Sequence, residues 1–202
     1  QQLEAQQEKD ANALALIDRQ LDLRHPEIRQ TELDQAIASA SSPIKVQIFR
    51  LAHRTRKTNW REDINKPQME RVIPIFRALL KDDPEHKFHR NHAELAFALK
   101  DKRHSTKADY REAEAELNTA IAMRGERLNQ GWSYYEFNRA LCRIELYGDD
   151  PKMQDAILDD LAKAAQDNFF FEEMVDELRN WKLKSWLKDK ADFQTLLSRS
   201  TN

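Results

Sequence analysis

Glycine is scarce in this chain: only three of its 202 residues are glycine, whereas proteins on average contain about 7%. Glycines at positions 125, 131 and 148 cannot form a G-x-G-x-x-G turn or a G-x-x-x-x-G-K-S/T phosphate loop, so the common nucleotide-binding motifs are excluded. Tight β-hairpins also depend on glycine, which argues against a strand-rich sandwich or barrel. The scarcity of glycine therefore favours a helical fold.

Cysteine and long apolar runs are also lacking. Cys142 is the single cysteine, so no disulfide can form within the chain, and its place between Leu141 and Ile144 indicates a structural thiol. No apolar run reaches the roughly 18 residues that span a bilayer. We therefore expect a cytoplasmic protein without a membrane span. Because the chain opens on Gln1 rather than Met, we interpret it as a piece of a longer protein whose other domains hold any chemistry.

Charge of one sign does not dominate, and charged residues are frequent. The chain has 33 Lys and Arg against 35 Asp and Glu, a net charge of -2, so no global field draws it to nucleic acid or to membranes. Hydrophobic residues make up 40% of the chain, which is enough for a core if they are spread along amphipathic helices.

Proline divides the chain into helical segments. Five prolines precede stretches with helical periodicity, where a missing N–H would be unpaired in any case. Pro74 instead falls inside an apolar run, where it should bend a helix or mark its late start. The five prolines are Pro26, Pro43, Pro67, Pro84 and Pro151, and Ser42, Asp83 and Asp150 are candidate N-caps before three of them. The predicted helices span 4–23, 27–39, 44–57, 67–82, 85–101, 107–124, 131–147 and 151–167, with two or three short helices between 170 and 198.

Three pairs of these predicted helices share one spacing of small and apolar residues. The first helices align at Ala52, Ala93 and Ala140. The second helices align at Val72, Phe76 and Leu79, then at Ala113, Leu117 and Ala120, then at Ile157, Leu161 and Ala164. All four positions advance by 41 residues between the first pair and the second, which indicates an internal repeat.

This spacing resembles the tetratricopeptide repeat (TPR) family, in which a small residue lies in the middle of the first helix and small, large and small residues follow in the second. Pro84 also matches the proline that closes a repeat of that family. The resemblance implies an all-α fold, an α-solenoid of about three TPR-like helix-turn-helix repeats with helical caps at both ends. The expected parts are residues 1–40 as an N-terminal linker or cap, repeats at 44–84, 85–127 and 131–167, and capping helices at 168–202. A generic α-solenoid is the alternative.

No group of residues points to catalysis, a cofactor or a metal. His86, His89 and His92 follow at three-residue spacing, but they drift around the helix and no second helix offers a matching Glu-x-x-His, so a polar helix face explains them better than a metal site. No serine lies in a G-x-S-x-G elbow. We therefore expect neither an enzyme nor a bound cofactor or metal in these residues.

The charges are nevertheless unevenly distributed. From Pro43 to Arg61 the chain carries six Lys and Arg and no acid, whereas from Glu145 to Glu177 it carries 11 acids against two lysines. Three interpretations remain open: two solvated faces, a positive surface for an anionic partner, or head-to-tail contact between subunits that would form an oligomer.

The TPR resemblance implies where a partner would bind. The first helices of that family line a concave groove, and an asparagine two residues before the central small residue often holds the backbone of a bound peptide. Carried onto this chain, the partner-binding groove comprises Arg50, His53, Lys57, Asn91, Glu94, Asn138 and Leu141. A protein or peptide with acidic residues or a free C-terminal carboxylate would complement its basic end.

Two functions follow from these patterns. The first is a protein–protein interaction scaffold or regulatory binding module within a larger protein. The alternative is a helical-repeat module for nucleic acid, because guanidinium groups and an aromatic stacking surface occur together in the basic segment; against it stand the acidic C-terminal third and a pI near 6.4. That alternative patch comprises Arg50, Arg54, Arg56, Lys57, Trp60 and Arg61.

Overall fold

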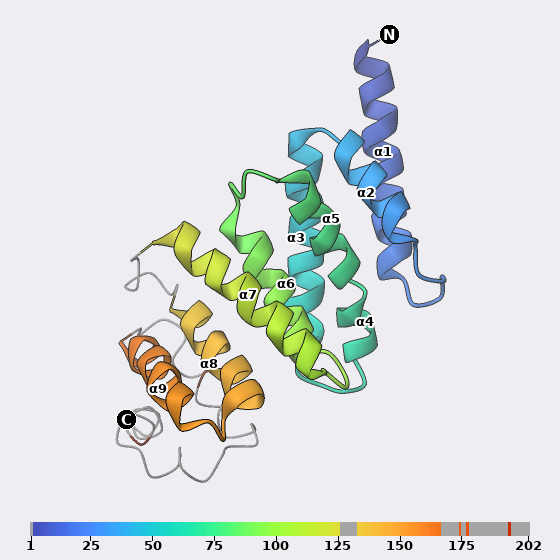
Figure 1. The fold of residues 1–202 in the computed structure, drawn as a ribbon. Coiled ribbons are helices and arrows are strands. Elements are labelled where there is room, and N and C mark those ends of the chain that lie inside the picture. Colours follow the sequence, from blue (N-terminus) through green and yellow to red (C-terminus); the bar gives the residue numbers. More distant parts are fainter. Residues whose placement is uncertain (1, 126–132, 167–173, 175–176, 178–193, 195–202) are drawn as a thin grey trace. The chain divides into compact units, whose positions relative to one another are not determined.

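The computed structural model describes residues 2–125 and 133–166, together with residues 174, 177 and 194. Its described residues form helices and connecting turns and contain no strand, which confirms the all-α prediction (Figure 1). The chain divides into two compact units, Gln1–Ser105 (unit 1) and Thr106–Asn202 (unit 2).

Unit 1 contains six described helices and unit 2 contains three. Those of unit 1 are α1 (Gln2–Leu21), α2 (Gln30–Ser39), α3 (Ser42–Asn59), α4 (Lys66–Glu70), α5 (Ile73–Asp82) and α6 (His89–Asp101). Those of unit 2 are α7 (Lys107–Arg124), α8 (Tyr134–Tyr147) and α9 (Pro151–Ala165).

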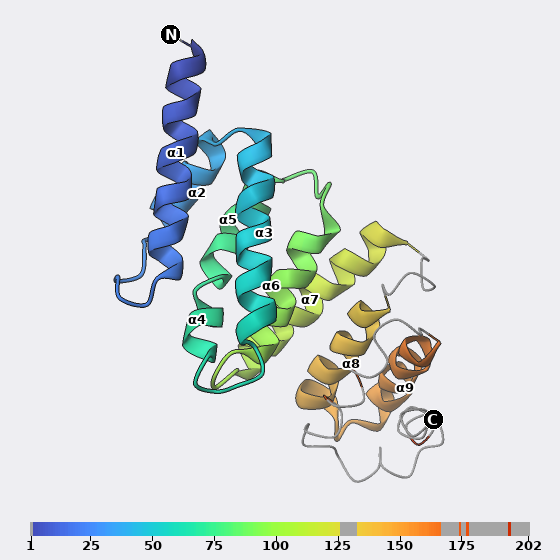
Figure 2. The same cartoon turned by 180° about the vertical axis from the view of Figure 1, so that it is seen from behind.

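In unit 1 helices pack against neighbours in sequence and against more distant helices, and α5 lies at the centre. Helix α1 packs against α2, α2 against α5, and α5 against both α3 and α6 (Figures 1 and 2). Fully buried side chains from all six helices form the core, among them Ile17, Leu33, Ile48 and Phe76. The sequence forms these helices because its apolar residues recur at helical spacing, so that each helix buries one stripe against its neighbours.

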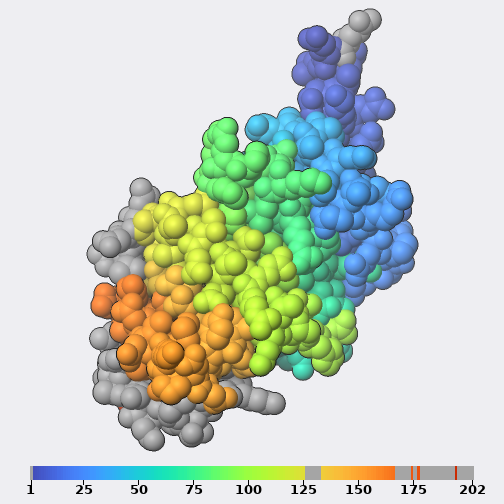
Figure 3. All heavy atoms as spheres, viewed as in Figure 1, coloured from blue at the N-terminus to red at the C-terminus, as the bar shows by residue number. Residues whose placement is uncertain are grey.

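The first turns of α1 extend beyond the other helices of unit 1 (Figure 3). Where α1 meets the start of α3, Asp10 accepts hydrogen bonds from the backbone N–H of Ser41 at 2.7 Å and from its hydroxyl at 2.6 Å. These bonds lower the pKa of the Asp10 carboxyl. Ser42 is therefore not an N-cap: α3 begins at Ser42, after the N-cap residue Ser41, whose side chain bonds α1 instead.

The predicted helix 67–82 is two helices. Helix α4 ends at Glu70, and α5 begins at Ile73 with Pro74 in its first turn. Pro74 thus marks a late start, one of the two outcomes expected of it, because a proline in the first turn lacks only an N–H that would have no helical partner. The backbone oxygen of Pro74 accepts a hydrogen bond from Gln30 of α2 at 2.9 Å.

Two other predicted helices begin later than expected. Pro26 and Pro84 lie in the connections between helices, and the helices after them start at Gln30 and His89. Asp83 is not an N-cap: it follows the last residue of α5, and its carboxylate accepts the backbone N–H of Phe88 at 2.9 Å, so it orders the loop before α6. Asp150 is an N-cap as predicted, because its side chain accepts the backbone N–H of Lys152.

In unit 2, α8 packs against both α7 and α9. A capping box begins α7, in which Thr106 and Asp109 each accept the other's backbone N–H. Buried side chains of α8 and α9, including Phe137, Leu141 and Leu161, form one apolar cluster. The predicted capping helices between 170 and 198, and the predicted helix start at 131, lie outside the described residues.

The repeat positions are buried, as their spacing predicts. The twelve positions of the alignment have exposed fractions of 5% or less: Ala52, Val72, Phe76, Leu79, Ala93, Ala113, Leu117, Ala120, Ala140, Ile157, Leu161 and Ala164. The division between the two units falls between Ser105 and Thr106, inside the segment 85–127 that was predicted as the second repeat.

Candidate binding face on helix α3

Helix α3 presents a cationic face on unit 1. Arg50, Arg54 and Lys57 follow one another at spacings of four and three residues, which places them on one side of the helix. All three are exposed, and within the described part of the chain their side chains have no ion pair or hydrogen bond. Figure 2 shows α3 in front of α5 and α6. These three charges are therefore available to an anionic partner.

Arg61 follows the end of α3, four residues after Lys57. Its guanidinium group lies 5.1 Å from the ring centroid of Trp60, which is partly buried directly after the last residue of the helix. Arg61 itself is exposed. We call Arg50, Arg54, Lys57 and Arg61 the α3 basic face.

Arg56 belongs to the interior of unit 1 and not to this face. Only 6% of the residue is exposed; its guanidinium group pairs with the carboxylate of Glu94 on α6 and lies 5.0 Å from the ring centroid of Phe97. Nδ1 of His53 lies 2.9 Å from the same carboxylate. Five of the six residues predicted for the nucleic-acid patch thus lie at or beside the face, and Arg56 is taken up inside the fold.

Glu94 is ionised despite its burial. Burial of the side chain raises its pKa, but the charge of Arg56 and the hydrogen bonds from His53 and Arg56 outweigh this effect and lower the pKa to about 2. The carboxylate is therefore a structural anion that holds α6 against α3.

The residues predicted for the groove lie in both units. Arg50, His53 and Lys57 are on α3, and Asn91 and Glu94 are on α6, so five of them belong to unit 1, where His53 and Glu94 are in direct contact. Asn138 and Leu141 lie on α8 of unit 2, and their exposed fractions are 1% for Asn138 and 0% for Leu141. Within unit 1, Asn91 and Glu94 are buried, whereas Arg50 and Lys57 are exposed.

The two asparagines at equivalent repeat positions share an unusual property. The side-chain oxygens of Asn91 and Asn138 are buried and have no hydrogen-bond donor in the described part of the chain. The amide nitrogen of Asn138 donates to the backbone oxygen of Tyr134 at 2.8 Å. A buried acceptor without a donor costs roughly 1–3 kcal/mol, so both positions would gain from a donor that the described residues do not supply.

An aromatic cluster at the N-terminal half of α3 was missed from the sequence. Phe49 lies at its centre, stacked on His53 at 5.9 Å between ring centroids and in edge contact with Phe88 at 5.5 Å. The guanidinium group of Arg90 lies 5.2 Å from the ring centroid of Phe49. Phe49 is buried, but Phe88, in the loop before α6, is 47% exposed. The four-residue spacing of Phe49 and His53 was visible in the sequence; the approach of Phe88 depends on the path of the loop.

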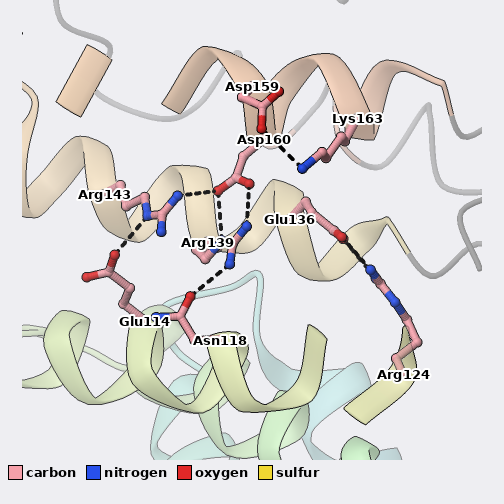
Figure 4. A network of polar contacts seen from close by, with 9 residues as sticks. All are labelled: Glu114, Asn118, Arg124, Glu136, Arg139, Arg143, Asp159, Asp160 and Lys163. Atoms are coloured by element: carbon pink, nitrogen blue, oxygen red, sulfur yellow. Dashed lines mark hydrogen bonds and ion pairs between the residues drawn. The ribbon is translucent and has the colours of Figure 1, made fainter. Parts of the chain in front are cut away.

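In unit 2 the charged side chains between α7, α8 and α9 neutralise one another (Figure 4). Asp160 of α9 accepts hydrogen bonds from Arg139 at 2.6 and 2.9 Å and from Arg143 at 3.0 Å, and Arg143 also donates to Glu114 of α7 at 2.8 Å. Burial lowers the pKa of Arg139, but its hydrogen bonds to Asp160 outweigh this and raise it. This network joins three helices, and its charges are paired with one another within unit 2.

A second buried pair joins α7 to α8. The guanidinium group of Arg124 pairs with both oxygens of the Glu136 carboxylate and lies 5.5 Å from the ring centroid of Tyr135. Both side chains are 3% exposed. Such bidentate, desolvated pairs fix the register of neighbouring helices, so we assign this pair to the packing of unit 2.

The described residues contain no group of three or more His, Cys, Asp or Glu side chains that could hold a metal ion. Nδ1 of His86 lies 3.0 Å from Nε2 of His92, so two of the three spaced histidines bond each other across the loop before α6. Cys142 is buried at 0% exposure. None of the described helices is both long enough and apolar enough to cross a bilayer.

Comparison with known protein families, with curated proteins and with solved structures found no match to this chain.

Proposed function

We propose that this chain is a protein-interaction module, and that the α3 basic face of unit 1 binds an acidic segment of a partner protein. The observation that carries the proposal is the set of exposed cations on α3 that have no acidic partner within the described residues. An unpaired surface cation contributes little to the stability of its own fold, whereas several cations on one face can bind a partner with matching negative charge.

The geometry of α3 supports an extended partner. Arg50 and Lys57 are seven residues apart, about 10 Å along a helix that rises 1.5 Å per residue. Acidic residues three positions apart in a peptide with polyproline II conformation lie on one face at a similar separation, about 9 Å, since such a chain rises about 3.1 Å per residue and turns once every three residues. An extended segment with spaced Asp or Glu would therefore meet two or three of these cations at once.

Asn91 is not part of this contact surface, because its side-chain oxygen is buried within unit 1. The TPR-like repeat and the α-solenoid are part of the same proposal; the burial of the aligned repeat positions supports them.

A nucleic-acid module is the second candidate, because Arg61 stacks on Trp60 beside the basic face. Bases stack on aromatic side chains and on guanidinium planes, and phosphates would pair with Arg50, Arg54 and Lys57. The even balance of charge over the whole chain favours the protein partner.

The test combines Arg50→Glu with Lys57→Glu. We expect this variant to lose binding of fluorescein-labelled peptides rich in Asp and Glu, measured by fluorescence anisotropy, and to lose the specific partner that the wild-type chain captures from lysate. The matched control is Lys9→Glu with Arg19→Glu, which reverses the charge of one exposed Lys and one exposed Arg on α1. This control should still bind the acidic peptides and capture the partner. Both variants should fold, since surface substitutions change stability by about 0.5 kcal/mol or less.

The same titrations distinguish the two candidates. A protein partner predicts that Trp60→Ala keeps peptide binding and that labelled single-stranded RNA and DNA bind weakly. Micromolar binding to oligonucleotides that falls steeply with salt and is lost in Trp60→Ala, together with no response to acidic peptides, would replace the proposal by the nucleic-acid function.

A further inference from the structure

The loop before α6 holds an exposed aromatic side chain in a fixed place. Phe88 donates its backbone N–H to Asp83, and the ring of His86 in the same loop bonds His92 on α6. The rings of Phe88 and Phe49, on α3, are in T-shaped contact. Phe88 is therefore anchored through its backbone, its loop and this ring contact, yet 47% of the residue remains exposed.

Two arginines lie next to Phe49, whose ring contacts the ring of Phe88. Arg50 is the next residue after Phe49, and Arg90 is two residues after Phe88 with its guanidinium group over the Phe49 ring. Within the described residues neither arginine has an ion pair. One turn before Arg50 on the same side of α3 lies Val46, which is 46% exposed. Apolar surface and unpaired positive charge thus meet at the N-terminal half of α3, and only the charge continues toward its C-terminal end.

We propose that this end of α3 is an anchor site, and that the acidic partner segment carries one aromatic or large aliphatic residue at the end of its acidic run that packs against Phe88 and Val46. This proposal rests on the proposed function, because the acids of the same segment bind the α3 basic face. Charge complementarity identifies the occupant as an acidic peptide, and the apolar spot beside Arg50 gives that peptide a direction along α3. Buried aromatic anchors rimmed by polar contacts carry most of the binding energy in many protein interfaces.

The experiment compares two labelled peptides by fluorescence anisotropy. Both carry the same run of Asp and Glu; one ends in Phe and the other in Ala. We expect the Phe peptide to bind the wild-type chain about tenfold more tightly, a gain typical of one anchor. Phe88→Ala should abolish this tenfold gain while leaving the affinity for the Ala peptide within about twofold of wild type. Leu23→Ala is the matched control, since Leu23 is 48% exposed and lies in the turn between α1 and α2; it should keep the full gain.

Each outcome has one meaning. Equal affinity of the wild-type chain for the two peptides would overturn the anchor site and leave the proposed function standing. A tenfold gain that persists in Phe88→Ala would also overturn it, because the anchor would then lie elsewhere. Failure of both peptides to bind would overturn the proposed function itself. If Phe88→Ala unfolds thermally at the same midpoint as the wild-type chain, the loss of the tenfold gain in affinity comes from the missing ring and not from a damaged fold.

Discussion

Arg56 and Lys57 are adjacent in the sequence, yet their side chains lie in different environments. Ile48, Ala52 and Arg56 repeat every four residues, so Arg56 continues the stripe of α3 that faces the core. Burying a guanidinium group is tolerated there because Glu94 supplies the opposite charge. Lys57 is turned about 100° around the helix and reaches solvent. The register of the helix therefore decides which cations of the basic segment can meet a partner.

Glu94 should make the stability of unit 1 depend on acid pH. Its pKa is about 2 in the fold, against 4.5 for a free carboxyl, so the stability it contributes is fully present above about pH 4.5 and is lost as pH falls toward 2. The shift corresponds to about 3 kcal/mol. At neutral pH, Glu94→Gln leaves the charge of Arg56 buried without compensation, and we expect it to cost about 3–5 kcal/mol in urea unfolding followed by circular dichroism.

The control for this prediction is Glu62→Gln, which removes an exposed carboxylate from the turn after α3 and should change stability by about 0.5 kcal/mol or less. The difference in unfolding free energy between the wild-type chain and Glu94→Gln should shrink as pH falls from 4.5 to 2, because protonation removes the same charge. A difference that stays constant over that range would contradict an ionised Glu94.

Some of the candidate site could be predicted from the sequence. The absence of acids between Pro43 and Arg61 located the basic face, and the four-residue repeat through Ala52 could have shown that Arg56 faces the core. Its pairing with Glu94 depends on how α6 packs against α3, which the helical period alone does not give. Phe88 carried no signal, because the exposure of a loop aromatic depends on the path of the backbone and not on periodicity.

Helix type was predicted better than helix boundaries. Apolar spacing determines which residues a helix buries, so the aligned repeat positions are buried as expected. Where a helix starts depends instead on local hydrogen bonds. Asp83 could cap a helix starting at Pro84, or it could accept a hydrogen bond within the loop that follows α5. The structure has the second arrangement, in which the Asp83 carboxylate accepts the N–H of Phe88. The proline rule alone cannot distinguish these alternatives.

The small residues of the repeat should tolerate no enlargement. Ala120 on α7 is fully buried, so Ala120→Trp must displace its neighbours, and we expect a loss of about 1–3 kcal/mol in unfolding free energy. Ala122→Trp on the same helix is the matched control, since Ala122 is exposed and its replacement should change stability by about 0.5 kcal/mol or less. Thermal and urea unfolding measure both. Equal melting temperatures for Ala120→Trp and the wild-type chain would contradict the alignment of Ala120 with the small positions of the other repeats.

At the scale of the whole molecule, the nearly neutral total conceals two units of opposite charge. Unit 1 carries 19 Lys and Arg against 16 Asp and Glu, whereas unit 2 carries 14 against 19. Part of this charge is neutralised inside each unit, as with Arg56 in unit 1 and with Arg139 and Arg143 in unit 2. The α3 basic face has no acidic partner among the described residues, and acidic residues of another copy could attract it.

This attraction should be too weak to hold copies of the chain together under physiological conditions. Exposed ion pairs contribute about 0–1 kcal/mol each, and at about 0.15 M ionic strength charges are screened within roughly 8 Å. A stable homodimer also needs a large, well-packed interface. We therefore expect a monomer in sedimentation velocity at that ionic strength, with weak association appearing only in low salt and disappearing in Arg50→Glu combined with Lys57→Glu. A salt-resistant dimer that this variant dissociates would show instead that the α3 basic face binds a second copy of the chain, because charge attraction alone would not survive screening.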